Sequence, residues 1–220
     1  MSSLKSKRAS SSSAAGGGPP PITAALPPPP YPMGILPHYT RHATPITLRI
    51  RELKSPFGGD DFVIKDALTR QPILQVEAKM FSFSAKKTMR DHTGRPLFDF
   101  RRTSTFSPAK VFGGYACGSN KKLFEVEMLG IFKPKLNIEF YNHAGDGKAE
   151  RWVLRGQWLS GSSQITTQSG VVVASISRDY ANMGQIFFNV QTYDVTVAPG
   201  IDAAFVSAVC VCLDEAYNDK

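Results

Sequence analysis

Basic residues gather in one part of this sequence. Between Lys79 and Lys110, eight Lys and Arg residues stand against only two acids, Asp91 and Asp99. A phosphate group is best held by several cations that converge on it, and arginine can donate two parallel hydrogen bonds to it. The stretch therefore predicts a binding site for anionic phospholipid head groups, with six candidate residues: Lys86, Lys87, Arg90, Arg95, Arg101 and Arg102.

Two predicted strands and the turn between them would position these cations. Residues 81–89 alternate polar and apolar side chains, which places Lys86 on the same face as Ser82 and Ser84. Arg90 follows four residues after Lys86, and residues 91–96 form a strong turn into a second strand at 97–102. Adjacent antiparallel strands can bring such cations together.

Two other interpretations of the basic cluster stay open. It could be a solvated rim that binds nothing, or a surface with a loose attraction to nucleic acid or membranes. Specific nucleic-acid binding is disfavoured because it calls for aromatic rings on the same outward face. The alternation predicts that the nearby rings point into the protein interior instead: Phe81, Phe83, Phe98 and Phe100.

The remaining residue types offer little chemistry. None of the four histidines belongs to a nucleophile or metal motif: His38, His42, His92 and His143. The three cysteines, Cys117, Cys210 and Cys212, lack a second metal-binding pair, so reduced thiols are expected and no zinc. We predict a protein without enzymatic activity, cofactor or metal.

Short alternating runs separated by turn signals fill the sequence from Thr44 to Val197. A period of two is typical of β-strands, and in the first run Leu48 and Ile50 alternate with Arg49 and Arg51. Residues 160–163 are expected to interrupt the pattern. About eleven or twelve strands are predicted, at residues 47–53, 61–65, 73–79, 81–89, 97–102, 110–117, 123–129, 136–141, 151–158, 171–177 and 185–197.

Residues 201–213, IDAAFVSAVCVCL, predict a helix that is apolar all round, with Asp202 at its N-terminus. A strand at Val209–Cys212 is the alternative, but thirteen continuous residues exceed a usual buried strand. A helix without a polar face must be buried on every side, and this one is too short to span a bilayer. The acids Asp214 and Glu215 oppose the helix dipole at its C-terminus.

Many antiparallel strands and one wholly apolar helix favour a single packing. We predict a mostly β (α+β) fold, in which a closed antiparallel barrel of about twelve strands surrounds the central C-terminal helix. The barrel domain would span residues 45–220 and follow a disordered Ser/Gly/Pro-rich tail at residues 1–44.

The tail carries one candidate partner motif. Pro28, Pro29 and Tyr31 match the Pro-Pro-x-Tyr pattern that WW domains bind in extended form. No secretory signal or membrane-spanning stretch is recognised, and free thiols suit a reducing compartment. We therefore expect an intracellular monomer, cytoplasmic or nuclear, that attaches to a membrane only peripherally.

Three stretches of the sequence resemble a known family. They are FVIKD at Phe62–Asp66 with the hairpin into Gln75–Glu77, the strand–turn–strand unit of Phe81–Leu97, and the final strand and apolar helix of Tyr193–Glu215. Over about residues 45–218, the sequence is similar to the LURP-one-related branch of the tubby C-terminal-like superfamily. The resemblance implies a closed barrel threaded by its last helix.

The resemblance also implies possible functions. Tubby proteins bind phosphoinositide head groups through Lys and Arg of the barrel wall, and Lys86, Lys87 and Arg90 are the nearest equivalents by analogy. LURP-one-related proteins have no established biochemical activity. We expect a peripheral phospholipid-binding adaptor, with a scaffold recruited through the Pro-rich tail as the alternative. Lipid scrambling is disfavoured, since the chain lacks the acylated cysteine cluster and outward membrane helix of scramblases.

Overall fold

The computed structural model describes residues 26–54, 60–79, 86–103, 109–129, 135–157, 162–177 and 192–218. In these ranges a short 3-10 helix, η1 (Pro37–Thr40), precedes twelve strands, and the helix α1 (Ala203–Asn218) follows them. The strands are β1 (Ile46–Leu53), β2 (Asp61–Asp66), β3 (Pro72–Ala78), β4 (Lys87–Asp91), β5 (Pro96–Arg102), β6 (Lys110–Ala116), β7 (Lys122–Leu129), β8 (Lys135–Tyr141), β9 (Ala149–Gln157), β10 (Ser162–Thr167), β11 (Val172–Ser177) and β12 (Thr192–Val197).

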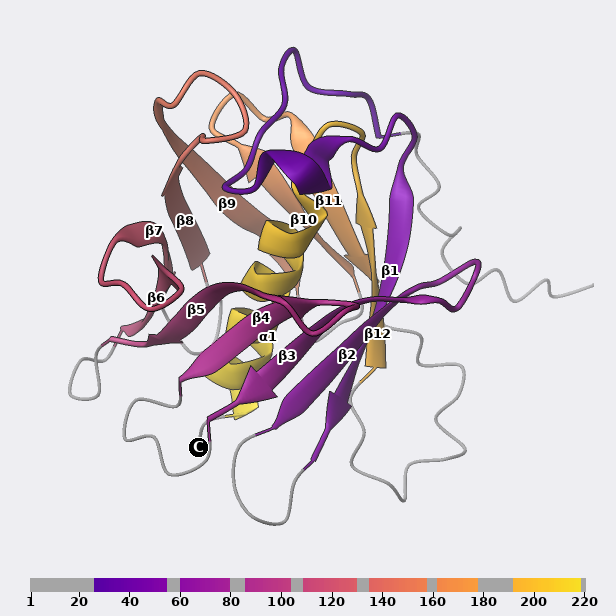
Figure 1. Ribbon diagram of the computed structural model, residues 1–220. Helices are drawn as coiled ribbons and strands as arrows, with labels where there is room; N and C mark the ends of the chain where they lie inside the picture. The colour runs from indigo at the N-terminus through magenta and orange to yellow at the C-terminus, as the bar shows by residue number, and fades with distance from the viewer. Residues whose placement is uncertain are drawn as a thin grey trace, which may run out of the picture.

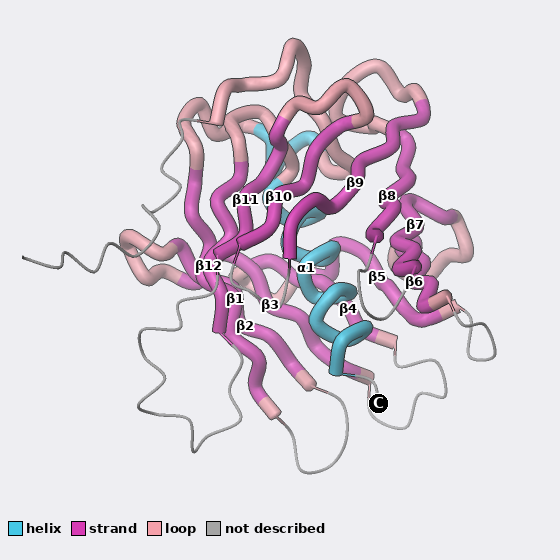
Figure 2. The backbone as a smooth tube through the Cα atoms, turned by 180° about the vertical axis from the view of Figure 1, so that it is seen from behind, coloured by secondary structure: helices cyan, strands magenta, loops and turns pink. Residues whose placement is uncertain are grey.

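The sheet closes on itself. β1 pairs antiparallel with β2 on one side and with β12 on the other, and the remaining strands pair in sequence order. Closure removes the free strand edges that an open sheet would expose. α1 runs through the middle of the barrel in both views (Figure 1 and Figure 2). The prediction of a closed antiparallel barrel around the C-terminal helix is confirmed.

Alternation along each strand separates the barrel interior from its outer wall. On β1, Leu48 and Ile50 are fully buried, whereas Arg49 and Arg51 are exposed. Phe98 and Phe100 are buried, as predicted, and Phe81 and Phe83 lie outside the described residues.

The helix fills the interior. Phe205 packs against three rings of the wall, with centroid separations of 5.1 Å to Phe124, 4.8 Å to Phe140 and 5.4 Å to Trp152. Every residue from Ala203 to Asp214 is buried, which confirms a helix without a polar face. Within the described part of the chain, no helix is long and apolar enough to cross a membrane.

The strand β10 was not predicted from the sequence. This strand pairs with both β9 and β11, and Ile165, Thr166 and Thr167 are buried. Ser and Thr dominate it, so it lacks the apolar alternation that identified the other strands. Two strands begin several residues after their predicted starts: β4 begins at Lys87 and β12 at Thr192, with residues 81–85 and 185–191 outside the described ranges.

Residues 26–44, which were expected to belong to a disordered tail, pack on the barrel. Leu26, Met33 and Ile35 are buried in the same core as α1. Met33 also forms a parallel bridge with Ile201, and its N–H donates to the Gly200 carbonyl at 3.0 Å. A few apolar residues suffice here because they complete an existing core instead of building their own. We call residues 26–36 the strap; residues 1–25 lie outside the description.

Replacing the central aromatic ring of the helix tests this packing. Phe205→Ala should lower the free energy of unfolding by about 3–5 kcal/mol, because it removes a buried ring and leaves a cavity. Urea unfolding followed by tryptophan fluorescence would measure the loss. Leu68→Ala is the control, since Leu68 is 91% exposed and its truncation should change stability by less than about 0.5 kcal/mol. Similar losses for both variants would contradict the enclosed helix.

Candidate functional site

The six predicted cations do not share one face of the sheet. On β4, Lys87 and Met89 point into the barrel, so Lys86 and Arg90 lie on its outer face. On β5, Arg102 lies on the same strand face as Phe100, and Arg101 lies on the opposite one. One ligand therefore cannot contact all of these side chains from outside.

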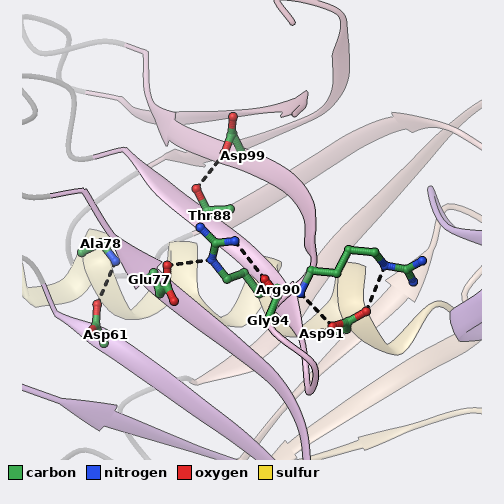
Figure 3. Close-up of polar contacts among 9 residues, drawn as sticks. Asp61, Glu77, Ala78, Thr88, Arg90, Asp91, Gly94 and Asp99 are labelled. Carbon is green, nitrogen blue, oxygen red and sulfur yellow. Dashed lines mark hydrogen bonds and ion pairs between the residues drawn. The ribbon is translucent and has the colours of Figure 1, made fainter. Parts of the chain in front are cut away.

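The outward cations of β4 are already engaged. The Lys86 ammonium lies 2.8 Å from the Asp99 carboxylate. Arg90 donates to the Glu77 carboxylate at 2.6 Å and to the Gly94 carbonyl at 2.9 Å (Figure 3). Both acids belong to neighbouring strands, so a phosphate at this place would have to compete with them.

The charged side chains of the turn between β4 and β5 bond to other groups of the same turn. Asp91 accepts hydrogen bonds from the Thr93 hydroxyl and from backbone N–H groups, and these hold the pKa of Asp91 down at about 2. Arg95 pairs with the same carboxylate at 3.1 Å, yet 70% of its side chain is exposed. Arg101 stacks over the Tyr115 ring, 4.3 Å from its centroid.

Lys87 is not a surface residue. It is only 3% exposed, and its ammonium lies 3.0 Å from the Glu215 carboxylate. It also donates to the Asp60 carbonyl at 2.6 Å and lies 5.2 Å from the centre of the Phe62 ring. The prediction that Lys87 binds a head group is therefore wrong, because the strand turns this side chain toward the C-terminal end of α1.

Cations at that end stabilise the helix. The last carbonyls of α1 lack helical partners, and Asp214 and Glu215 add charge of the unfavourable sign for the dipole. Lys87 neutralises Glu215, and Lys110 donates to the Ala216 carbonyl at 2.6 Å. These contacts allow α1 to continue to Asn218, beyond the end predicted at Leu213.

Glu52 is another inward-facing charge at this end of the barrel. It follows Ile50 on the interior face of β1, is 1% exposed, and its Oε2 atom has no hydrogen-bond partner in the described part of the protein. Burial first, and then the neighbouring carboxylates Asp214 and Asp60, raise the pKa of Glu52 to about 7.

The opposite end of α1 is closed by the strap. One oxygen of Asp202 accepts the N–H groups of Ala204 and Phe205, both at 3.0 Å, which confirms Asp202 at the helix N-terminus. The other oxygen accepts the N–H groups of Ile35 at 3.0 Å and Leu36 at 2.7 Å. Complete burial raises the pKa of Asp202 to about 6, although these four bonds favour its ionised form.

The predicted WW-binding motif lies in the strap. Pro28 is exposed and Pro29 half-buried, while the Tyr31 hydroxyl donates to a Glu150 oxygen at 2.9 Å. That hydrogen bond raises the pKa of Tyr31. The buried side chains of Leu26 and Met33 hold the motif on both sides, so a WW domain would have to detach it from the barrel. WW binding stays a prediction.

A second group of outward cations was not identified from the sequence. Arg49, Arg51 and Lys65 lie on the outer face of β1 and β2, and Arg49 pairs with Asp194 of β12 at 2.7 Å. The signal was present, since the alternation in residues 47–53 already placed both arginines outward. It was overlooked because this part of the sequence carries no excess of charge.

A groove of about 610 Å³ lies over β7, β8 and β9. Four of its five charges pair within the groove, Lys122 with Glu125 and Arg151 with Glu139. Among the described residues, no three His, Cys, Asp or Glu side chains are placed to hold a metal ion. All three cysteines are free, and burial raises the pKa of Cys212 well above its ordinary value.

Comparison with known proteins identifies relatives of this barrel. A family model described as LURP-one-related matches residues 46–214. Two Arabidopsis thaliana proteins, LURP-one-related 15 and LURP-one-related 10, are each 25% identical to this chain, over 80% and 78% of it and 82% and 90% of their own lengths. A solved X-ray structure of an Arabidopsis thaliana protein covers 83% of this chain and 96% of its own, with a TM-score of 0.59 and 23% identity.

Two adjacent lysines provide a matched test of the inward and outward faces. Lys87→Ala should lower the free energy of unfolding by about 3–5 kcal/mol, because it leaves the Glu215 charge without its buried partner. Lys86→Ala should cost only about 0–1 kcal/mol, since its ion pair with Asp99 is partly solvated. Urea denaturation of both variants would measure this, and equal losses would contradict the assignment of faces.

The raised pKa of Glu52 predicts a dependence of stability on pH. Between the ordinary glutamate value of 4.5 and about 7, the folded state holds a proton that the unfolded state has released. The free energy of unfolding should therefore fall as the pH rises through this window. Glu52→Gln removes the titration and should flatten this part of the profile, measured by urea unfolding at a series of pH values. Parallel profiles for the two proteins would exclude Glu52 as the titrating group.

Proposed function

Because the chain belongs to the LURP-one-related family and has a tubby-like barrel, we propose that it is a non-enzymatic adaptor that binds anionic phospholipid head groups at a membrane surface, phosphoinositides included. Two features of the barrel support the proposal, the filled interior and the charge of the outer wall.

Buried side chains of the described residues pack around the helix in the interior. Phe205 and the aromatic rings around it fill the middle of the barrel, and Asp202 and Lys87 are bound at the two ends of α1. A partner or ligand therefore meets the outer wall, where alternate residues of every strand are presented.

The observation that carries the proposal is the positive charge of this wall between β1 and β5. Counting Lys86, which immediately precedes β4, and Asp194 of β12, which pairs with Arg49, six outward cations face four outward acids, an excess of two. The cations are Arg49, Arg51, Lys65, Lys86, Arg90 and Arg101, and the acids are Asp61, Glu77, Asp99 and Asp194.

Such an excess is enough for reversible attachment. Each Lys or Arg near an anionic membrane contributes about 1 kcal/mol. Two unmatched charges would favour binding by about 2 kcal/mol, which corresponds to a partition coefficient roughly 30-fold above that for neutral lipid. Attachment of this kind should weaken as salt screens the charges.

Vesicle co-sedimentation tests the proposal with the wild-type protein. We expect binding to phosphatidylcholine vesicles that contain phosphatidylserine or a phosphoinositide, and little binding to phosphatidylcholine alone. Raising the salt concentration should release the protein, whereas a contact made through apolar side chains alone would persist. Equal binding to neutral and anionic vesicles would reject the proposal.

A further inference from the structure

The cations of the outer wall differ in whether a carboxylate or an aromatic ring of the protein lies against them. On β4 and β5, Lys86 pairs with Asp99, Arg90 with Glu77, and Arg101 with the Tyr115 ring. On β1 and β2, Arg51 and Lys65 are exposed, and neither has a carboxylate partner among the described residues. The unmatched positive charge of the wall is therefore concentrated on β1 and β2.

The strand register brings these cations together. Lys65 lies directly opposite Arg49 across the β1–β2 ladder, which sets their Cβ atoms about 5 Å apart. Arg51 follows two residues along the same face, at about 7 Å from Arg49. Its neighbours across the ladders are Val63 and Thr192, which are short and carry no charge. All three side chains can reach one phosphate group.

The charges on this face repel one another. Two cations directly opposite in a ladder destabilise it, and the carboxylate across the other ladder from Arg49, Asp194, already accepts two hydrogen bonds from it, at 2.8 and 2.7 Å. A bound anion would offset the repulsion that the Arg49–Asp194 pair leaves. Arginine side chains suit a phosphate in particular because their planar donors can hold two of its oxygens.

The adjoining hairpin points to a lipid surface as the source of that phosphate. At the tip of the β2–β3 turn, Leu68 is 91% exposed, next to the exposed Arg70. Asp66 holds the tip in shape by accepting the N–H groups of Leu68 at 2.8 Å and Thr69 at 2.6 Å. This hairpin projects from the side of the barrel beside β1 (Figure 1). An apolar side chain flanked by cations is typical of surfaces that insert shallowly between lipid head groups.

Nucleic acid suits this face less well. The outward residues of β1 and β2 include no aromatic ring on which a base could stack; they are Thr47, Arg49, Arg51, Leu53, Asp61, Val63 and Lys65. We therefore infer that the outer face of β1 and β2, together with the Leu68 tip, is the surface that binds phosphate-bearing lipid head groups. This inference rests on the proposed function and assigns its site to Arg49, Arg51, Lys65, Leu68 and Arg70.

Two double variants with the same loss of charge test the site. Each lost lysine or arginine should weaken binding about fivefold where it faces the membrane. Arg51→Ala/Lys65→Ala should therefore reduce co-sedimentation with phosphoinositide vesicles by about 25-fold. Lys86→Ala/Arg90→Ala removes two cations that already have partners and should cost about fivefold or less. Equal losses for the two variants would overturn the site.

Further measurements separate the inference from its alternatives. Leu68→Ser should weaken binding to vesicles but leave binding of a soluble inositol phosphate unchanged, because only the membrane offers apolar contact. If Leu68→Ser has no effect on vesicle binding, the inference that the Leu68 tip contacts the membrane is wrong. A labelled oligonucleotide that binds through Arg51 and Lys65 when vesicles do not would assign the face to nucleic acid. If the wild-type protein does not bind anionic vesicles at all, the proposed function itself is wrong.

Discussion

A helix that is buried on every side is the constraint on which the rest of this structure depends. Only the last turn of α1 is partly exposed, so most of the free N–H and C=O groups at its ends need partners within the protein. Asp202 supplies them at the N-terminus and ties the strap to the helix with the same carboxylate. At the C-terminus, Lys110 caps a carbonyl and Lys87 neutralises an acid. Polar contacts with the strap and the barrel wall therefore fix both ends of the helix.

This constraint decides which charged residues are available to a ligand. A one-residue step along a strand moves a side chain from the wall to the interior. Lys86 and Lys87 are neighbours in the sequence, yet the first meets solvent and the second meets Glu215. When a cluster of cations in the sequence forms a strand, some of its side chains therefore face the interior and the others face the outer wall. Only those on the outer wall can face a membrane.

The features that repeat along the chain could be predicted from the sequence. The two-residue alternation placed Leu48, Ile50, Phe98 and Phe100 in the interior, and the missing polar face of α1 implied a sheet closed around it. The strand β10 could not be found in this way, because serine and threonine carry no such alternation. The position of the strap was also hidden, since its packing depends on a helix more than 160 residues away, as in the Ile35–Asp202 hydrogen bond.

Pairing between strands explains why the candidate site was misplaced. The net charge around a position on the wall depends on the residues opposite it on two neighbouring strands. A count of charges along the sequence does not include these residues. Residues 79–110 are rich in cations, but Glu77 and Glu215 come from outside that stretch to match Arg90 and Lys87. Around Arg51 the sequence carries no such excess, and its neighbours in the sheet are Val63 and Thr192. In a closed barrel, the strand register determines which charges on the wall lack a partner of opposite sign. An anion-binding surface is expected where the register leaves cations without such partners.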